Sequence, residues 1–373
     1  MYVGLDVHKD FCQAAFVSSN GEFVKEERFE NTCSGLADLA QATKDCEVVM
    51  ESSNSSMHVY DALSKTCKVK VAHPSRVKAI ASARIKTDKI DARILAHLLR
   101  ANLIPESFVP SPEYRQARLI VRHRASLVEV RTQIKNKIHA ILIRDGIKSP
   151  FTEKFGREGM LFLKHVDIGE AQRASLDSLL SVLEALSKQV KEADRRVEYH
   201  ASQDAYAKLL ATHPGVGRLT ALAAASEICD ISRFSSHKKL SSYFGLVPSV
   251  YQSGGTDRKG HITKEGSSLM RWLLVQCAWT AVKRSRRFKR KYDKLKKRVG
   301  KNKAIVAIAR TIAVDMYFML VKNEEYKEPK EERKRGKPVT SPGTQRPSFR
   351  LGSSPRHDPT PCESKQTPKA SCA

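Results

Sequence analysis

The chain has 373 residues, 41% of them hydrophobic, which is enough for about two average domains with substantial cores. Its 66 lysines and arginines against 40 acidic residues give a net charge of +26, which indicates a polyanionic partner such as DNA or RNA. We find no run of about 18 apolar residues and no apolar leader, so we expect a cytoplasmic protein without a membrane partner. Eight scattered cysteines without a CxxC pair argue against a zinc ribbon and a disulfide framework.

The first 110 residues alternate strand and helix patterns and carry equal numbers of basic and acidic residues, 14 of each. Short apolar and β-branched runs predict five strands, at residues 2–5, 11–18, 22–29, 47–50 and 69–72. Helical spacing of apolar residues predicts three helices, at residues 34–43, 55–66 and 87–100. A turn signal at residues 19–21 joins the second and third strands. We therefore expect an α/β or mixed-sheet domain over residues 1–110.

The middle of the chain is predicted to be helical. Three prolines in residues 104–112 mark a boundary, after which apolar residues recur with helical spacing over 113–144 and again over 170–200. Two long amphipathic helices with charged outer faces indicate an antiparallel hairpin or coiled coil. Helix packing inside a single domain is an equally good interpretation. We assign residues 111–205 to this helical linker.

The last part of the chain is basic and mostly helical, and we assign residues 206–322 to a third domain. Residues 213–217 (HPGVG) have the pattern of a helix-hairpin-helix turn, whose backbone N–H groups can contact phosphate, although such turns also simply join helices. Residues 283–303 contain 13 basic residues and one acid. Eight of the fifteen prolines lie in the last 49 residues, so we expect residues 323–373 to form a disordered, basic tail.

Four carboxylates stand out by their positions. Asp6 and Glu51 each end a predicted strand, and Asp88 and Asp91 lie three apart at the start of a helix, on one face. Such a cluster repels itself unless cations are present, and Mg²⁺ takes oxygen ligands while keeping positions open for phosphate. Taken singly, each acid has a structural explanation as a helix cap or turn residue. Together, in so basic a chain, they favour a metal-dependent phosphoryl-transfer site of the ribonuclease-H type.

A second candidate is Ser253, which precedes two glycines. A serine hydroxyl can attack phosphorus and hold DNA covalently if other groups take its proton and stabilise charge. Nearby basic residues suit that role: Arg258, Lys259, His261, Lys264 and Arg271. From the residues alone, an ordinary Ser-Gly-Gly turn is the better interpretation.

In their order along the chain, these motifs resemble the DEDD transposases of insertion sequences, the insertion-sequence one-ten family that also contains Piv-like invertases. The resemblance covers about residues 1–322. The N-terminal likeness lies in three segments, residues 2–9 (YVGLDVHK), 49–53 (VMESS) and 86–92 (KTDKIDA). The C-terminal likeness lies in four more, residues 214–217 (PGVG), 244–248 (FGLVP), 253–254 (SG) and 262–266 (ITKEG).

The resemblance implies a RuvC-like N-terminal domain whose tetrad, Asp6, Glu51, Asp88 and Asp91, binds Mg²⁺ or Mn²⁺. It implies a coiled-coil linker, a mostly α-helical transposase domain and Ser253 as the nucleophile that forms a phosphoserine link to DNA. It further implies a noncoding bridge RNA, a dimer or tetramer, and association with the nucleoid of a prokaryote. Two alternatives stay open: a RuvC-like nuclease that uses the tetrad without serine chemistry, and a non-catalytic nucleic-acid-binding protein.

Overall fold

The computed structural model describes residues 1–53, 55–81, 87–253 and 256–328. Most of the predicted disordered tail, residues 323–373, lies outside this part of the chain. The described chain continues past the predicted tail boundary, because Tyr326 packs against His213 with ring centroids 4.4 Å apart.

The N-terminal region is built on a mixed five-stranded sheet in the order β3-β2-β1-β4-β5. The strands are β1 (Tyr2–Val7), β2 (Phe11–Val17), β3 (Phe23–Glu30), β4 (Glu47–Glu51) and β5 (Lys68–Ala72). The first three run antiparallel, whereas β4 and β5 run parallel to β1. All five predicted strands and the mixed α/β character are confirmed. Consecutive residues of β1, β2 and β4 are buried, which explains why these strands appear in the sequence as short apolar runs.

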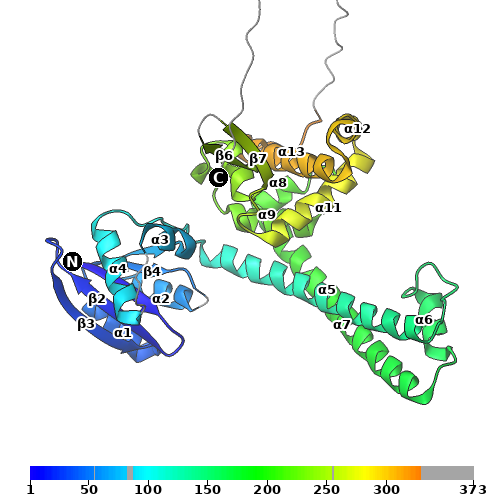
Figure 1. Ribbon diagram of the computed structural model, residues 1–373, viewed down its shortest axis with the longest axis horizontal. Coiled ribbons are helices and arrows are strands. Elements are labelled where there is room, and N and C mark those ends of the chain that lie inside the picture. Colours follow the sequence, from blue (N-terminus) through cyan, green and yellow to red (C-terminus); the bar gives the residue numbers. More distant parts are fainter. Residues whose placement is uncertain (54, 82–86, 254–255, 329–373) are drawn as a thin grey trace, which may run out of the picture. The chain divides into compact units, whose positions relative to one another are not determined.

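Helices cover both faces of this sheet (Figure 1). On one face, α1 (Cys33–Ala42) and α2 (Ser56–Leu63) pack their leucines against a cluster that includes Leu5 and Met50. On the other face, α3 (Pro74–Ile80) and α4 (Asp88–Arg100) pack in a separate cluster, which includes Val49, Leu95 and Leu99. The sheet is therefore buried on both sides, and α4 lies over β1.

Gly4 lets α4 lie unusually close to β1. A Cβ atom at this position would be 2.0 Å from the carbonyl oxygen of Ala92 and 2.6 Å from the backbone nitrogen of Ala96. Both clashing atoms belong to the backbone of α4, so no side-chain rotation can relieve the overlap. Gly4 thus sets the distance between the strand that carries Asp6 and the helix that carries Asp88.

We expect Gly4→Ala to lower the free energy of unfolding by at least about 1–3 kcal/mol, the usual cost of overpacking. It should also weaken divalent-metal binding, because α4 must move away from β1. Urea unfolding and a metal titration would measure the two effects. Gly217→Ala is the control, since its new Cβ would meet nothing within 4 Å and should cost only a weaker helix cap. Equal effects of the two substitutions would contradict this account.

The middle of the chain forms a long helical hairpin. Helix α5 (Pro112–Arg144) packs along α7 (Glu170–Gln203), with α6 (Arg157–His165) at the connection between them (Figure 1). The C-terminal part of α5 shares a core with the N-terminal part of α7, where Ile138 and Leu142 pack in one cluster with Leu176. Near the other end of the hairpin, Arg124 pairs with Asp194 at 2.8 Å. The two helices therefore run antiparallel, as the apolar spacing predicts.

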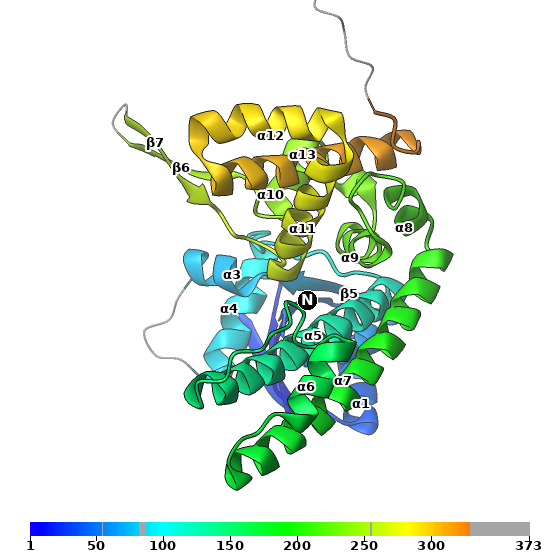
Figure 2. The ribbon, with the colours of Figure 1, turned by 90° about the vertical axis from the view of Figure 1, so that its right-hand side faces the viewer.

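The C-terminal region is mostly helical and has its own core. Its helices are α8 (Ala205–Leu210), α9 (Arg218–Ile228), the short 3₁₀ helix η1 (Ile231–Arg233), α10 (His237–Tyr243), α11 (Ser268–Arg284), α12 (Arg286–Val299) and α13 (Lys301–Lys322). Residues 243–266, which are rich in turn-forming types, contain two strands that the sequence pattern did not predict. These are β6 (Pro248–Ser253) and β7 (Thr256–Ile262), paired antiparallel in a hairpin that extends from the helices (Figure 2).

Helix α13 is an apolar helix of the C-terminal core. It is the one helix in the described residues that is long and apolar enough to cross a membrane, by length and composition only. Half of the apolar 18-residue stretch of α13 is buried, and Ile308, Ile312 and Met316 are fully buried in the C-terminal core.

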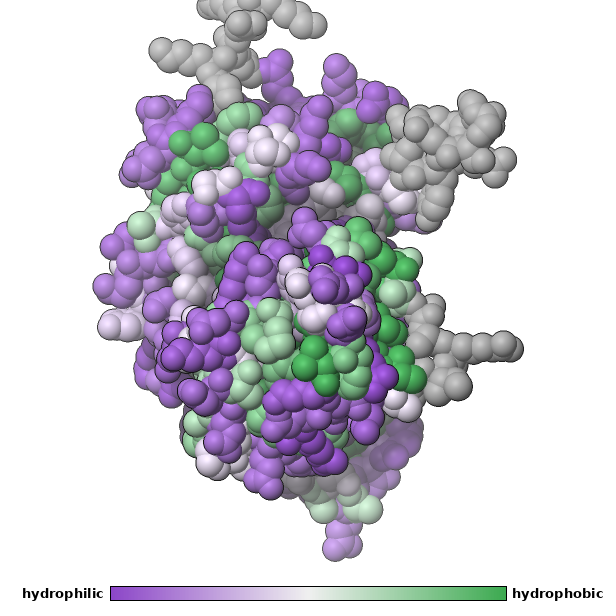
Figure 3. Space-filling view, turned by 90° about the vertical axis from the view of Figure 1, so that its left-hand side faces the viewer, coloured by the Kyte–Doolittle hydropathy of each residue, from purple (hydrophilic) through white to green (hydrophobic). Residues whose placement is uncertain are grey.

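One face of the molecule, drawn in Figure 3, is mostly hydrophilic with smaller apolar areas between the polar side chains.

The predicted turn at residues 213–217 joins two helices, α8 and α9. The structure explains why one of its residues, Gly215, is a glycine. Gly215 has a φ of +96°, and a Cβ there would lie 2.7 Å from backbone atoms of Cys277 and Ala281. Its role is therefore close packing against α11. His213 is buried, with its Nε2 3.3 Å from an Asp315 carboxylate oxygen, which fits a structural histidine.

Candidate functional site

The structure brings the strand-end carboxylates to one edge of the sheet. In the parallel pairing of β1 with β4, Leu5 lies opposite Met50. The next residue of each strand, Asp6 in β1 and Glu51 in β4, therefore lies at the same height along the sheet. Leu5 and Met50 face the α1–α2 side of the sheet. Because successive residues of a strand point to opposite faces, Asp6 and Glu51 lie on the α4 side.

Helix α4 begins beside this edge and supplies the paired aspartates. Thr87 caps the helix, and its hydroxyl accepts a hydrogen bond from the Ile90 N–H at 3.3 Å. Asp88 and Asp91 both lie in the first helical turn. Burial raises the pKa of the Asp6 carboxyl most, and the charges of both aspartates raise it further, so all three carboxylates are close enough to interact.

His8 is a member of this cluster that the sequence analysis did not single out. Its Nε2 lies 3.2 Å from an Asp6 oxygen and 3.3 Å from an Asp88 oxygen, between the two carboxylates. The ring stacks on Phe11 with centroids 4.6 Å apart, and the Asn31 side-chain amide donates to the His8 carbonyl at 2.9 Å. The available signal was position in the chain, because His8 follows β1 directly and lies two residues after Asp6.

The donor atoms of this cluster fit a divalent cation. Burial raises the pKa of the Asp6 carboxyl most strongly, while the neighbouring His8 lowers it. One ligand atom each from Asp6, His8 and Asp88 all lie within 4.8 Å of one another. Carboxylate oxygens suit Mg²⁺ and Mn²⁺, and an imidazole is a common ligand of transition metals. A cation bound here would relieve the repulsion among the acids.

Ser253 lies in another element, at the end of β6, where its backbone pairs with Thr256 of β7. The two residues between them, and the side chain of Ser253, lie outside the described residues, as do the side chains of Arg258 and Lys259. The structure therefore puts the candidate serine at the far end of a hairpin rather than in an irregular loop.

The base of this hairpin is held by close backbone packing. Gly245 and Gly266 have φ values of +65° and +68°, and a Cβ at Gly245 would lie 2.4 Å from the Glu265 carbonyl oxygen. Arg271 donates to the carbonyl of Gly266 at 3.1 Å and also to that of Glu265. Arg271, which the sequence suggested as a phosphate partner, thus clamps the hairpin base.

Helix α12 carries a densely basic surface. Phe288 and Tyr292 are buried against the core, while basic side chains cover the exposed side of the helix, namely Arg286, Lys289, Lys294, Lys296, Lys297 and Arg298. Arg287 lies toward α13 and contacts both oxygens of Asp315, at 2.7 and 3.1 Å. Burial tends to raise the pKa of Asp315, but hydrogen bonds from His213 and Arg287 outweigh it and lower that pKa.

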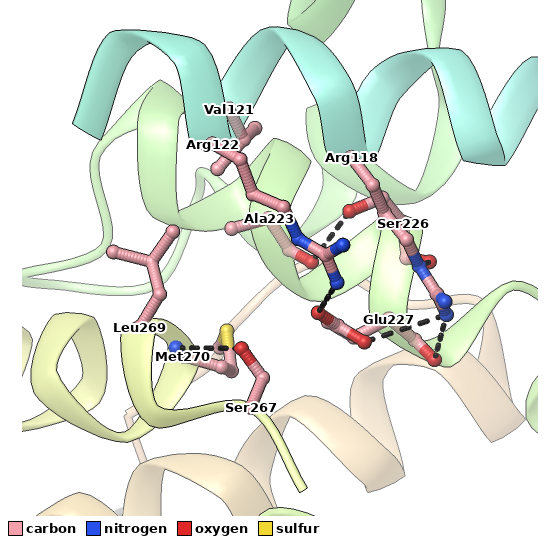
Figure 4. A pocket seen from close by; sticks show the side chains of 9 residues that line it. All are labelled: Arg118, Val121, Arg122, Ala223, Ser226, Glu227, Ser267, Leu269 and Met270. Atoms are coloured by element: carbon pink, nitrogen blue, oxygen red, sulfur yellow. Dashed lines mark hydrogen bonds and ion pairs between the residues drawn. The ribbon is translucent and has the colours of Figure 1, made fainter. Parts of the chain in front are cut away.

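The helical hairpin is joined to the C-terminal helices through a buried acid on α9. Glu227 lies 3.4 Å from Arg118 and 3.7 Å from Arg122, both on α5 (Figure 4). Arg118 also donates to the Ser226 carbonyl at 2.8 Å. The adjoining pocket has a volume of only about 10 Å³, about the space of one water. These contacts join α5 to α9.

Comparison with known proteins matches the regions that contain the acids and Ser253. A family model described as a DEDD transposase matches residues 3–144, which include the four acids, and the model of the IS116/IS110/IS902 transposase family matches residues 207–293, which include Ser253. Together the two matched regions take in more than half of the chain.

Curated relatives agree with this result. The chain is 31% identical over 252 residues to a putative transposase, y4qE, of Sinorhizobium fredii, covering 67% of this chain and 62% of that protein. It is 26% identical over 338 residues to the transposase of insertion sequence IS1111A from Coxiella burnetii, covering 87% and 91%. It is 27% identical over 285 residues to the transposase of IS1328 from Yersinia enterocolitica, covering 74% and 82%. The chain therefore belongs to the IS110 family of insertion-sequence transposases.

Proposed function

We propose that this protein is the transposase of an insertion sequence and that it cuts and rejoins DNA with the help of divalent metal. The observation that carries the proposal is the convergence of carboxylates at one sheet edge, where Asp6 and Asp88 face the same His8 nitrogen. Asp6, Glu51, Asp88 and Asp91 would hold Mg²⁺ or Mn²⁺. Such a cation would stabilise the negative charge that develops on the phosphate.

In this proposal the N-terminal region is a ribonuclease-H-like domain. The strand order β3-β2-β1-β4-β5, with three antiparallel strands followed by two parallel ones, supports this assignment. We divide the chain into a catalytic domain over residues 1–110, a helical linker over 111–205 and a transposase domain over 206–322.

Ser253 would be the nucleophile of the reaction. Its oxygen would form a bond to phosphorus while one bridging P–O bond of the DNA breaks. The serine proton would pass to a neighbouring base, and the released DNA oxygen would take up a proton. The position of Ser253 at the end of the β6–β7 hairpin supports this role, because an extended hairpin can present a hydroxyl to a bound duplex.

Nucleic acid and further copies of this chain would be its partners. The exposed cations of α12 support contact with phosphate backbone, which would weaken steeply with salt. A noncoding bridge RNA encoded beside the gene would select the DNA. A dimer or tetramer would combine the tetrad of one subunit with the serine of another.

Removal of metal tests this proposal. The full chain, its flanking RNA and labelled DNA with the element ends would be incubated with Mg²⁺, with and without a chelator. We expect strand cleavage only where free Mg²⁺ is present, and full recovery when Mg²⁺ is restored, because the acids cannot bind phosphate without a cation. Cleavage that persists under chelation would contradict the metal site, and binding without any cleavage would favour a non-catalytic protein.

A further inference from the structure

The connection between α5 and α7 contains a cleft that neither the tetrad nor Ser253 involves. It is open, has a volume of about 460 Å³, and is lined by α5 and by the segment that leads into α6. Its lining includes Lys135, His139, Glu153, Lys154, Phe155 and Gly156. Lys135 lies 17 residues from Arg118 along α5, or about 26 Å at 1.5 Å per residue, which separates the cleft from the joint at Glu227.

Positive charge exceeds negative charge in this cleft, where Lys135, His139 and Lys154 lie with a single carboxylate, Glu153. Residues 131–157 contain seven lysines and arginines and two acids. Within the described residues, neither Lys135 nor Lys154 forms an ion pair. Burial lowers the pKa of His139 most, and the charges of Lys154 and Lys135 lower it further. Burial and the charge of Arg131 lower the pKa of Lys135, and Glu153 raises it by a smaller amount. The cationic groups therefore repel one another in the absence of an anion.

Aromatic contacts with Phe155 position Lys135 and His139. The Lys135 ammonium lies 4.8 Å from the centre of the Phe155 ring, and the His139 ring meets that ring edge-on at 5.2 Å. Gly156, also in the lining, is the N-cap residue of α6, where no side chain caps the helix. The first-turn N–H groups of that helix add positive potential beside the two lysines, partly offset by Glu158 in the same turn.

We propose that this cleft binds a phosphate of a nucleic-acid backbone, with Lys135 and Lys154 as its charged contacts and His139 as an additional donor. Two ammonium groups and an imidazole around an open concave site match the charge and size of a phosphodiester. The proposal rests on the proposed function only in taking nucleic acid as the partner. The helical hairpin thereby becomes a second anchoring point for DNA or RNA, remote from the cleavage chemistry.

The test compares two double variants that remove the same charge. Lys135→Gln with Lys154→Gln alters the cleft, whereas Lys137→Gln with Lys148→Gln removes two exposed lysines of the same region. Binding of labelled duplex DNA and of a labelled RNA hairpin would be measured by anisotropy over a range of salt, with divalent metal chelated. We expect the cleft variant to bind at least one of them about eightfold more weakly at ~0.1 M salt, with a salt slope smaller by about 1, the value for one lost phosphate contact.

The outcomes distinguish a specific phosphate-binding site from general electrostatic attraction to the basic surface. The control should change affinity by less than about twofold, and equal losses in the two double variants would overturn the proposal. A single Glu153→Gln substitution should tighten binding, because it removes the one carboxylate in the lining. DNA and RNA arms show which backbone is bound, and competition by inorganic phosphate at fixed ionic strength would identify a free-phosphate site instead. Since no strand is cut, failure of this proposal leaves the tetrad untested, and failure of the tetrad leaves this result intact.

Discussion

Replacing Asp88 by asparagine is expected to abolish divalent-metal binding and to reduce DNA cleavage by more than about a hundredfold, the upper range found even for outer-shell metal partners. The carboxylate of Asp88 shares the His8 nitrogen with Asp6, so it is a central member of the cluster. Asparagine keeps the size of the side chain but removes its charge and one good oxygen ligand. Metal titration and a cleavage gel measure the two effects.

This substitution also separates catalysis from helix capping. The hydroxyl that caps α4 belongs to Thr87, so asparagine at position 88 should leave the helix and the stability of the domain nearly unchanged. Asp10→Asn is the matched control, since Asp10 is an exposed acid in the turn that follows β1. If the Asp88 variant cuts DNA as fast as the control, the acids are structural and the tetrad assignment fails.

Ser253→Ala is the second substitution with a large expected effect. It removes the proposed nucleophile but no metal ligand, so recombination of a donor plasmid should fall by at least about a thousandfold while metal and DNA binding persist. The measurement is the frequency of recombined plasmid in cells, beside DNA binding of the purified variant. This combination distinguishes loss of chemistry from loss of assembly.

Ser249→Ala provides the control in the same strand. The Ser249 hydroxyl donates to the His261 carbonyl at 3.1 Å across the hairpin, so its loss should cost only about 1 kcal/mol of local stability. Recombination should then remain within a few fold of that of the unchanged protein. Undiminished recombination in Ser253→Ala would leave a nuclease that uses the acids alone as the better interpretation.

The sequence could identify the acids as candidate site residues but could not predict that they lie close together in the fold. Strand ends and a helix start explain why Asp6, Glu51 and Asp88 were singled out. Their convergence depends on long-range contacts, above all on Gly4, whose missing side chain lets α4 approach β1. No local pattern carries that information, because the clashing partners lie about 90 residues away in the chain. His8 was missed because its role depends on its distance from Asp88, which only the fold sets.

The C-terminal region shows a different limit. Residues 248–262 are rich in polar and turn-forming types, so neither helical nor strand periodicity predicted the β6–β7 hairpin. The pairing is fixed at its base instead, by backbone packing at Gly245 and by Arg271 on the carbonyl groups. Tertiary contacts with Phe288 and its neighbours, which no local pattern reveals, make the apolar helix α13 a core element.

The measurement that tests the central claim most directly is a search for a covalent protein–DNA intermediate. The purified chain, its flanking RNA, Mg²⁺ and labelled donor DNA would be run on a denaturing gel, with and without protease treatment. The account predicts a slow, protease-sensitive band that disappears in both Ser253→Ala and Asp88→Asn. Cut DNA without any such band, lost in Asp88→Asn but unchanged in Ser253→Ala, would contradict serine recombination and leave a metal-dependent nuclease.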